Sequence, residues 1–343
     1  MINSTSAFVL KQKGSADQAF ELKEVKLPKL DSEEVLIQVD AFGLNYADVM
    51  ARNGLYKEAP PMPCVIGYEV VGKIIAGGEN VHKEWIGKRV VGFTRFGGYA
   101  KHAISTINGI ALINDISNEE ALALCTQGVT AYYMTNYFQH LHKGDFALIH
   151  AAAGGVGTML IQLLKLKGIN VIAKVSSKEK EELAKKIGAD FTINYIKNDY
   201  SESCERILNG AKFNAIYNPV GGSTFKKDLK LLNQGGALYL FGGSELSGGK
   251  LGFLSAVNFL IKMGIVLPIG LMMQSKSIIG VNMLKIGDNQ PQVILNCLNN
   301  CIRLFQEGKI KPQIGGVFST NELAKAHDFL ESGKSKGKLV IKW

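Results

Sequence analysis

The sequence is poor in the residues that mark disulfide-rich and secreted proteins. Its 343 residues include only five cysteines, scattered and odd in number, which argues against a disulfide-stabilised scaffold. The last two are four residues apart, so a helix would place them on one face, but no histidine or second cysteine pair lies beside them. We interpret them as core residues rather than a metal or redox pair. The cysteines are Cys64, Cys125, Cys204, Cys297 and Cys301.

The first residues, MINSTSAFVLKQKG, contain no charged segment leading into a long apolar run. This pattern predicts no signal peptide and, with the scattered cysteines, a reducing cytoplasmic compartment.

Clustered positive charge is also scarce, although the formal net charge is +9. No dense run of lysine and arginine is interleaved with aromatic residues. The nearest approach, KSKGK at 334–338, ends a helix-like segment. This distribution weighs against a nucleic-acid partner. A basic balance remains compatible with a site for phosphorylated ligands.

The longest apolar stretch, LGFLSAVNFLIKMGIVLPIGLMM at 251–273, is interrupted. About 20 residues are enough to span a bilayer, but Lys262 lies at the centre of this stretch and Pro268 would break a helix. A charge at the bilayer centre costs about 3 kcal/mol. We therefore expect an apolar helix pair that lines a pocket or a subunit interface. Association of its apolar surface with a membrane is the less favoured alternative.

The remaining composition is that of a packed globular protein, with 46% hydrophobic and 20% charged residues. The length predicts about two domains. Short β-branched runs dominate to about residue 110, and from about 120 strands alternate with helices, which is typical of a doubly wound parallel sheet. We predict a β-rich domain of residues 1–124 and 285–343 and an α/β domain of 125–284. The final strand, GKLVIKW, is expected to join the N-terminal sheet.

The stretch ALIHAAAGGVGT at 147–158 has the pattern of a dinucleotide-binding turn. A predicted strand, a glycine-rich turn and a predicted helix follow one another. Gly154 would let the backbone approach a pyrophosphate, and Gly157 would let the helix pack on the strand. Ala152 replaces the first glycine of the motif, which is tolerable if its φ is negative. The alternative is a tight strand-to-helix turn without a ligand.

The next strand lacks the acidic residue that holds the ribose hydroxyls of NAD. The corresponding stretch, VIAKVSSKEK at 171–180, offers hydroxyl and ammonium groups instead, among them Ser176 and Lys180. These groups suit a 2′-phosphate and favour NADPH. The alternative is a solvated helix start, which is the better interpretation for Lys178.

Several longer segments carry a resemblance to a known family. The sequence resembles the zinc-free quinone oxidoreductase branch of the medium-chain dehydrogenase/reductase superfamily, and within it the group of vesicle amine transport protein homologues. The matching segments are FGLNYADVMARNGLY at 42–56, GYEVVGKI at 67–74, CTQGVTAYY at 125–133, HAAAGGVGTMLIQLLK at 150–165, GADFTINY at 188–195 and the terminal SKGKLVI.

The resemblance implies an α/β protein with a GroES-like β-rich catalytic domain, residues 1–124 and 285–343, and a Rossmann cofactor domain, residues 125–284. It also implies NADPH, hydride transfer and a homodimer. The strand-like KSIIGVNML at 276–284 matches the edge where dimers of the family join their sheets, and pairing there would cover an exposed strand edge.

The same resemblance implies a set of cofactor-binding residues. Three of them, Ser176, Lys180 and Tyr195, fall where the family holds the 2′-phosphate, and Asn45 falls beside the nicotinamide. The full set is Asn45, Gln127, Thr130, Ala153, Gly154, Gly155, Val156, Gly157, Ser176, Lys180, Tyr195, Phe241, Gly242, Gly243 and Lys338. Asn218 departs from the family, whose members often have an acidic residue there, so the role of this turn is open.

No metal is expected. In the zinc-using relatives the ligands fall where this chain has Asn45, Tyr68 and Gln127 rather than cysteine, histidine and cysteine, and the four clustered cysteines of a structural zinc lobe are missing. Without a metal to polarise an alcohol, alcohol dehydrogenation is not expected.

The expected reaction is therefore reduction of an electron-poor carbon in a small hydrophobic electrophile, such as a quinone or an enone. Charge that builds on oxygen needs a donor, and the candidate catalytic residues are Tyr56, Asn45 and Tyr46. Some enoyl reductases of the superfamily carry an acid tyrosine in a similar loop, so Tyr56 is either a proton donor or a pocket wall.

Asp48 and Glu69 are expected to bond within their loops rather than to act as acid or base. Two other functions stay open. One is an enoyl-thioester reductase, and the other is a non-catalytic NADPH-binding protein that acts through a partner or a membrane surface.

Overall fold

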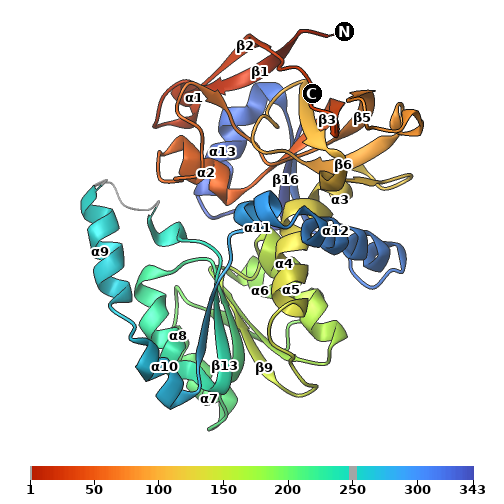
Figure 1. The fold of residues 1–343 in the computed structure, drawn as a ribbon. Coiled ribbons are helices and arrows are strands. Elements are labelled where there is room, and N and C mark those ends of the chain that lie inside the picture. The colour runs from red at the N-terminus through yellow and green to blue at the C-terminus, as the bar shows by residue number, and fades with distance from the viewer. Residues whose placement is uncertain (1, 247–252) are drawn as a thin grey trace. The chain divides into compact units, whose positions relative to one another are not determined.

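The computed structural model describes residues 2–246 and 253–343, and the chain forms two compact units (Figure 1). Unit 1 comprises residues 1–129 and 283–343, and unit 2 comprises residues 130–282. Unit 2 is thus inserted in the sequence between the two segments that form unit 1. The divisions at 129 and 283 lie within a few residues of the boundaries predicted at 124 and 284.

Unit 1 is built on two sheets. The first has the strand order β2-β1-β4, and the second has the order β15-β16-β3-β5-β6-β8, with β7 also paired to β3. The strands are β1 Ser4–Leu10, β2 Phe20–Lys26, β3 Glu34–Leu44, β4 Cys64–Val65, β5 Glu69–Gly77, β6 Arg89–Phe93, β7 His102–Thr106, β8 Ile110–Leu112, β15 Ile314–Ser319 and β16 Lys338–Lys342.

The final strand joins the N-terminal sheet. Strand β16 runs antiparallel to β3, with Leu339 opposite Leu44 and Ile341 opposite Phe42. These side chains belong to one apolar core together with residues of β5 and β6. Burial of this strand confirms the expectation from GKLVIKW, because its alternating Leu339 and Ile341 need an apolar face to cover them.

The helices of unit 1 are short apart from one. The helix α12 carries Cys297 and Cys301, both buried and neither in a disulfide, as expected of core residues. The α-helices assigned to the unit are α1 Ala16–Ala19, α2 Tyr46–Arg52, α3 Asn118–Leu122, α11 Met283–Asn289, α12 Pro291–Gln306 and α13 Leu323–Glu331; α4 Val129–Asn136 crosses the division between the units.

Unit 2 contains a six-stranded sheet in the order β11-β10-β9-β12-β13-β14, and every neighbouring pair is parallel. This order, with the first strand β9 in the middle, confirms the doubly wound architecture. The strands are β9 Phe146–Ile149, β10 Asn170–Val175, β11 Phe191–Asn194, β12 Phe213–Asn218, β13 Leu232–Leu240 and β14 Ser277–Gly280.

Helices of unit 2 connect these strands. They are α5 Gly155–Leu166, α6 Lys178–Lys186, α7 Tyr200–Leu208, α8 Phe225–Leu231, α9 Phe253–Met263 and α10 Pro268–Gln274. Residues of α7 and α8 cover one apolar cluster of the sheet. These two helices were not expected from the sequence, because each is short and rich in charged residues.

The apolar stretch 251–273 forms the bent pair α9 and α10, and its residues 251 and 252 lie outside the described part of the chain. Gly264 (φ 73°) ends α9 and Pro268 opens α10. Ile265 is 90% exposed and Met273 is 79% exposed. None of the described helices is long and apolar enough to cross a membrane by itself. Ala256–Met263 and Pro268–Gln274 meet that criterion only together, with a bend of 40°.

Candidate functional site

The glycine-rich turn after β9 has the backbone that a close approach of a ligand requires. Gly154 precedes α5 in an extended conformation (φ −74°, ψ 173°). A Cβ on Gly157 would lie 2.6 Å from both Ala151 O and Ala152 Cα, so only glycine allows the helix to lie this close to the turn. The residue with positive φ is Ala151 (49°), not Ala152. The replacement of the first glycine by Ala152 therefore carries no backbone strain.

The turn leads into the N-terminus of a twelve-residue helix. The first N–H groups of a helix have no acceptor within it, and the helix dipole adds positive potential there. Gly155, Val156 and Gly157 supply these groups, and Ala153 is buried just before them. The turn thus meets the requirements of a pyrophosphate site.

The end of β10 lies beside the end of β11, and a predicted 2′-phosphate residue follows each strand, Ser176 after β10 and Tyr195 after β11. The backbone N–H of Tyr195 donates to Val175 O at 3.1 Å, so Tyr195 lies next to the segment that continues into Ser176. The Tyr195 side chain is 44% exposed. Ser177 caps α6 by accepting from the N–H of Lys180 at 3.3 Å, which fixes the first turn where Lys180 stands.

Asn218 at the end of β12 organises the turn whose role the sequence left open. Its Nδ2 donates to Thr224 Oγ1 at 2.7 Å and to Asp228 Oδ2 at 2.6 Å. Its Oδ1 accepts from the N–H groups of Val220 (2.7 Å) and Gly221 (2.9 Å). A carboxylate could not donate to Asp228, so the amide suits this position where an acid would not.

The segment Phe241–Gly243 lies against this turn. The N–H of Phe241 donates to Asn218 O at 3.3 Å. A Cβ on Gly242 would lie 2.7 Å from Pro219 O, so the two strand ends can approach only because Gly242 has no side chain.

A second group of predicted residues meets in unit 1, around Asn45. Asn45 caps α2, and its Nδ2 donates to Glu69 Oε1 at 2.8 Å. The ammonium of Lys338 donates to Asn45 Oδ1 at 3.2 Å, to Leu44 O at 3.2 Å and to the Glu69 carboxylate. Both Glu69 and Lys338 are fully buried. The pair therefore fixes the orientation of the Asn45 amide and of the start of α2, where Tyr46 is the first residue.

These contacts settle what Glu69 does within unit 1. Its second oxygen accepts from the N–H of Thr126 at 2.7 Å, so each oxygen has a donor. The expectation that Glu69 bonds within its own loop was wrong, because Asn45, Thr126 and Lys338 are 24, 57 and 269 positions away in the chain. A Cβ on Gly43 would lie 2.4 Å from Glu69 Oε1 and 2.5 Å from Lys338 Cε. The buried ion pair thus fits only beside a glycine.

The N–H of Thr126 can donate to Glu69 because the chain is not α-helical at this point. Residues Ala123–Gly128 form a π-helical segment in which Cys125 has a non-helical ψ of −109°. Such segments break the regular hydrogen-bond ladder and often occur at functional sites. Gln127 is buried within this segment, and Thr130 is buried in α4. No feature of the helical apolar pattern in the sequence revealed this break.

Asp48 lies one turn into α2 and is fully buried. Its Oδ2 accepts from the N–H of Asn45 at 2.8 Å, whereas Oδ1 has no partner among the described residues. Burial raises the pKa of Asp48 to about 7 despite the nearby Lys338 ammonium. Asp48 therefore holds a proton over part of the physiological range.

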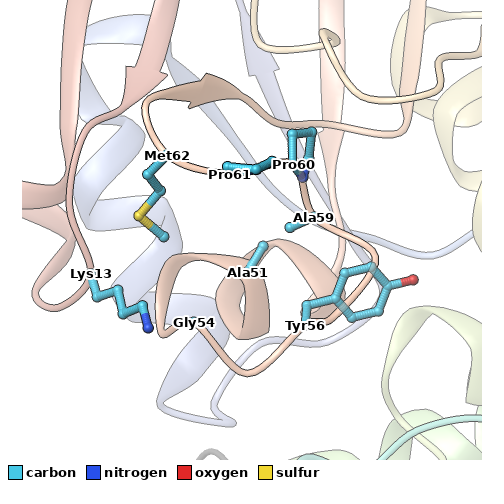
Figure 2. A pocket seen from close by; sticks show the side chains of 8 residues that line it. All are labelled: Lys13, Ala51, Gly54, Tyr56, Ala59, Pro60, Pro61 and Met62. Carbon is cyan, nitrogen blue, oxygen red and sulfur yellow. The ribbon is translucent and has the colours of Figure 1, made fainter.

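Tyr56 lies in the loop after α2, at the wall of a cavity of about 220 Å³ in unit 1. Figure 2 shows the ring beside Ala51 and Ala59, with its hydroxyl pointing away from Lys13 and Met62. Burial, with smaller contributions from Glu58 and Asp48, raises the pKa of Tyr56. The hydroxyl is thus kept protonated at neutral pH, as a hydrogen-bond donor must be. The cavity lining is Lys13, Ala51, Gly54, Tyr56, Ala59, Pro60, Pro61 and Met62.

Among the described residues, no three or more histidine, cysteine, aspartate or glutamate side chains form a group that could hold a metal ion.

Comparisons with known proteins agree with this architecture. Residues 31–144 match the family model described as alcohol dehydrogenase GroES-like domain, and residues 155–300 match the one described as zinc-binding dehydrogenase. The chain is 30% identical over 338 residues to a synaptic vesicle membrane protein VAT-1 homolog of Danio rerio, covering 98% of this chain and 69% of that protein. It is also 30% identical to a probable quinone oxidoreductase of Schizosaccharomyces pombe, covering 92% of this chain and 91% of the relative.

A solved structure of a quinone oxidoreductase has the same fold as this chain. The quinone oxidoreductase of Escherichia coli, crystallised in complex with NADPH, superposes with a TM-score of 0.85 at 25% identity, covering 98% of this chain and 100% of that one. The similarity in fold and in sequence to these proteins extends over at least 92% of this chain. The chain therefore belongs to the quinone oxidoreductase branch of the medium-chain dehydrogenase/reductase superfamily.

Proposed function

We propose that this protein is an NADPH-dependent oxidoreductase that reduces a quinone or an α,β-unsaturated carbonyl without a metal. One observation carries the choice of cofactor. The end of β10 has no carboxylate to hold ribose hydroxyls, and Tyr195 lies beside the segment that holds Ser176 and Lys180. Because a 2′-phosphate carries up to two negative charges, hydroxyl and ammonium groups are the complementary partners.

The residues fit this cofactor in a second respect. Three residues of the turn at 151–157, Gly154, Gly155 and Gly157, carry no side chain, and the N-terminus of α5 offers free N–H groups. NADPH, when bound, supplies the hydride. The chain itself binds the phosphates, orients the nicotinamide and places a proton donor.

Asn45 and Tyr56 are the residues we assign to orientation and proton donation. The Glu69 and Lys338 side chains hold the amide of Asn45 in one orientation, so it can position the cofactor ring at little entropic cost. Tyr56 would donate to the oxygen or the α-carbon that becomes basic as the β-carbon is reduced. Tyr46, at the start of α2, is the further candidate donor.

The substrate we propose is a small hydrophobic electrophile, because an electron-poor carbon accepts a hydride without a metal to polarise its oxygen. We also propose a cytoplasmic homodimer. In the part of the chain that the structure describes, strand β14 is the outer strand of its sheet and pairs only with β13. Such an edge is commonly covered by a second copy.

Binding of the cofactor is the first test. The purified protein is titrated with NADPH and NADH by fluorescence, and the titrations are repeated with Lys180→Ala and with Lys178→Ala as the matched control. We expect a strong preference for NADPH that collapses in Lys180→Ala and persists in Lys178→Ala. Equal binding of both cofactors by the wild type would contradict the assignment of the 2′-phosphate site.

A panel of quinones, enones and acyl thioesters then tests the reaction. Turnover of a quinone or an enone supports the proposal. Turnover of acyl thioesters alone would identify an enoyl-thioester reductase. Cofactor binding without turnover of any of these would favour a non-catalytic protein that works through a partner or a membrane surface.

A further inference from the structure

Three polar side chains form a row across the parallel sheet of unit 2. Leu148, Ile172 and Ile216 are paired in register on β9, β10 and β12 and belong to one apolar cluster. Since side chains alternate along a strand, the residues two positions further on return to the same face. These are His150, Lys174 and Asn218, and all three are buried. The row lies at the carboxyl ends of the strands, where ligands of doubly wound sheets bind.

The row is held together by a chain of hydrogen bonds that ends at Asp228 on α8. Lys174 Nζ lies 3.1 Å from His150 Nδ1, and His150 Nε2 lies 3.0 Å from Asp228 Oδ1. Tyr200 donates to the same oxygen at 2.9 Å. These partners assign the imidazole as neutral, with its proton on Nε2 toward Asp228 and Nδ1 accepting from the ammonium. Burial lowers the pKa of His150 and so keeps it neutral.

The ammonium of Lys174 is poorly compensated for a buried cation. Its one hydrogen-bond acceptor among the described residues is the neutral His150 Nδ1. The Lys174 nitrogen otherwise faces two aromatic rings, with the centroid of Tyr200 at 4.1 Å and that of Tyr195 at 4.8 Å. An ammonium has three donors, and Lys174 is only 6% exposed. An anion placed nearby would supply the interaction that water supplies elsewhere.

We propose that Lys174 is a further specificity-determining residue, whose buried ammonium attracts the 2′-phosphate of the cofactor from beneath Tyr195. This inference rests on the proposed function, because it assigns a new residue to the same phosphate site. Lys174 stands two residues before Ser176 and directly contacts the ring of Tyr195. Because the dielectric constant is lower in the protein interior, a buried ammonium attracts a phosphate more strongly than the ammonium of an exposed lysine does.

The competing explanation is that Lys174 merely balances Asp228 through His150. The two explanations differ in what a neutral side chain changes. A structural role alters stability and affects ligands with and without a 2′-phosphate alike, whereas a role in specificity affects only those that carry the phosphate.

The test compares Lys174→Met with Lys186→Met, which removes one exposed charge at the far end of α6. Binding of 2′,5′-ADP, 5′-AMP, NADPH and NADH is measured by calorimetry for the wild type and both variants. We expect Lys174→Met to weaken 2′,5′-ADP and NADPH about 10-fold or more, in line with a lost charged interaction. Binding of 5′-AMP and NADH should change less than about 2-fold, and Lys186→Met should match the wild type for all four ligands.

The outcomes separate the inference from the proposed function. If the wild type prefers NADPH and Lys174→Met keeps the same NADPH-to-NADH ratio, the inference is wrong and the proposed function stands. If the wild type binds neither cofactor, both are wrong.

A pH titration of the wild type gives a second arm that does not depend on the variant folding. Burial lowers the pKa of Lys174 to about 8. The preference for NADPH over NADH should therefore decline as pH rises through this value, and a constant ratio from pH 7 to 9.5 would overturn the inference. The charged and titratable groups facing Lys174 are His150, Tyr195, Asp199, Tyr200, Cys204, Lys227 and Asp228.

Discussion

The ammonium of Lys338 donates a hydrogen bond to the carboxylate of Glu69, and neither side chain has any exposed surface. The two residues are 269 positions apart in the chain. Their contact joins the last strand to β5, and both side chains also bond to the amide of Asn45. A buried ion pair of this kind gives little net stability, but loss of one partner leaves a charge without compensation.

Lys338→Met is expected to lower the free energy of unfolding by about 3–5 kcal/mol, because it leaves the Glu69 carboxylate buried and unpaired. The double variant Glu69→Gln with Lys338→Met should recover part of this loss, because it leaves no buried charge unpaired. Urea unfolding of the single and the double variant measures the two free energies of unfolding. Lys325→Met, which removes an exposed ammonium, serves as the control and should leave stability unchanged. A loss in Lys338→Met no larger than in this control would contradict the prediction.

The raised pKa of Asp48 predicts a dependence of stability on pH. In the unfolded chain this carboxyl loses its proton near pH 4, whereas in the folded protein it keeps the proton until about pH 7. The folded protein thus binds more protons over this interval, and Asp48 makes the free energy of unfolding fall as pH rises from about 4 to 7. Asp48→Asn should remove this effect.

Unfolding experiments at pH 4.5 and pH 8 measure the difference. Asp48→Asn should match the wild type at the lower pH and exceed its stability by roughly 2–4 kcal/mol at the higher pH, at 1.36 kcal/mol for each pKa unit. Asp115→Asn changes an exposed carboxyl and is the control for the change of net charge. Equal differences between Asp48→Asn and the wild type at both pH values would show that the Asp48 pKa is not raised.

Tyr56→Phe separates the two roles left open for this residue. If the hydroxyl donates a proton, kcat for an enone should fall about 100-fold or more while the Kd for NADPH is unchanged. If Tyr56 is only a wall of the cavity, kcat should stay and KM should change. Tyr217→Phe removes a buried hydroxyl that has no partner among the described residues of unit 2, and it controls for the loss of a phenol outside the site.

The exposed apolar residues of α10 and of the link that precedes it predict self-association. Ile265 and Met273 are almost fully exposed, so replacing both with serine should change the free energy of unfolding by no more than about 0.5 kcal/mol. The same change should reduce concentration-dependent association in sedimentation velocity if a second copy covers this surface. If the wild type stays monomeric at all concentrations measured, a second copy of the chain does not cover this surface.

How far the site could be predicted depends on the range of the interactions that build it. The glycine turn at 151–157 and the absence of a carboxylate after β10 are local, so spacing and residue type were enough to find them. Ala151 shows the limit even there, because the residue with positive φ lies one position before the one that replaces glycine in the motif. Helices α7 and α8 were missed because they are only nine and seven residues long, which gives an apolar period few turns in which to show itself.

The sequence by itself determined the alternation of strands and helices, the glycine turn and the chemical character of the β10 end. These follow from periodicity and backbone freedom, which each short segment carries within itself. Only the tertiary structure decided that Glu69, Lys338 and Asn45 form one buried cluster, and that Lys174 lies between His150 and two tyrosine rings. These contacts join strands and helices that are distant in sequence. Their partners are chosen by sheet register and burial, and the spacing of residues along the chain does not encode either.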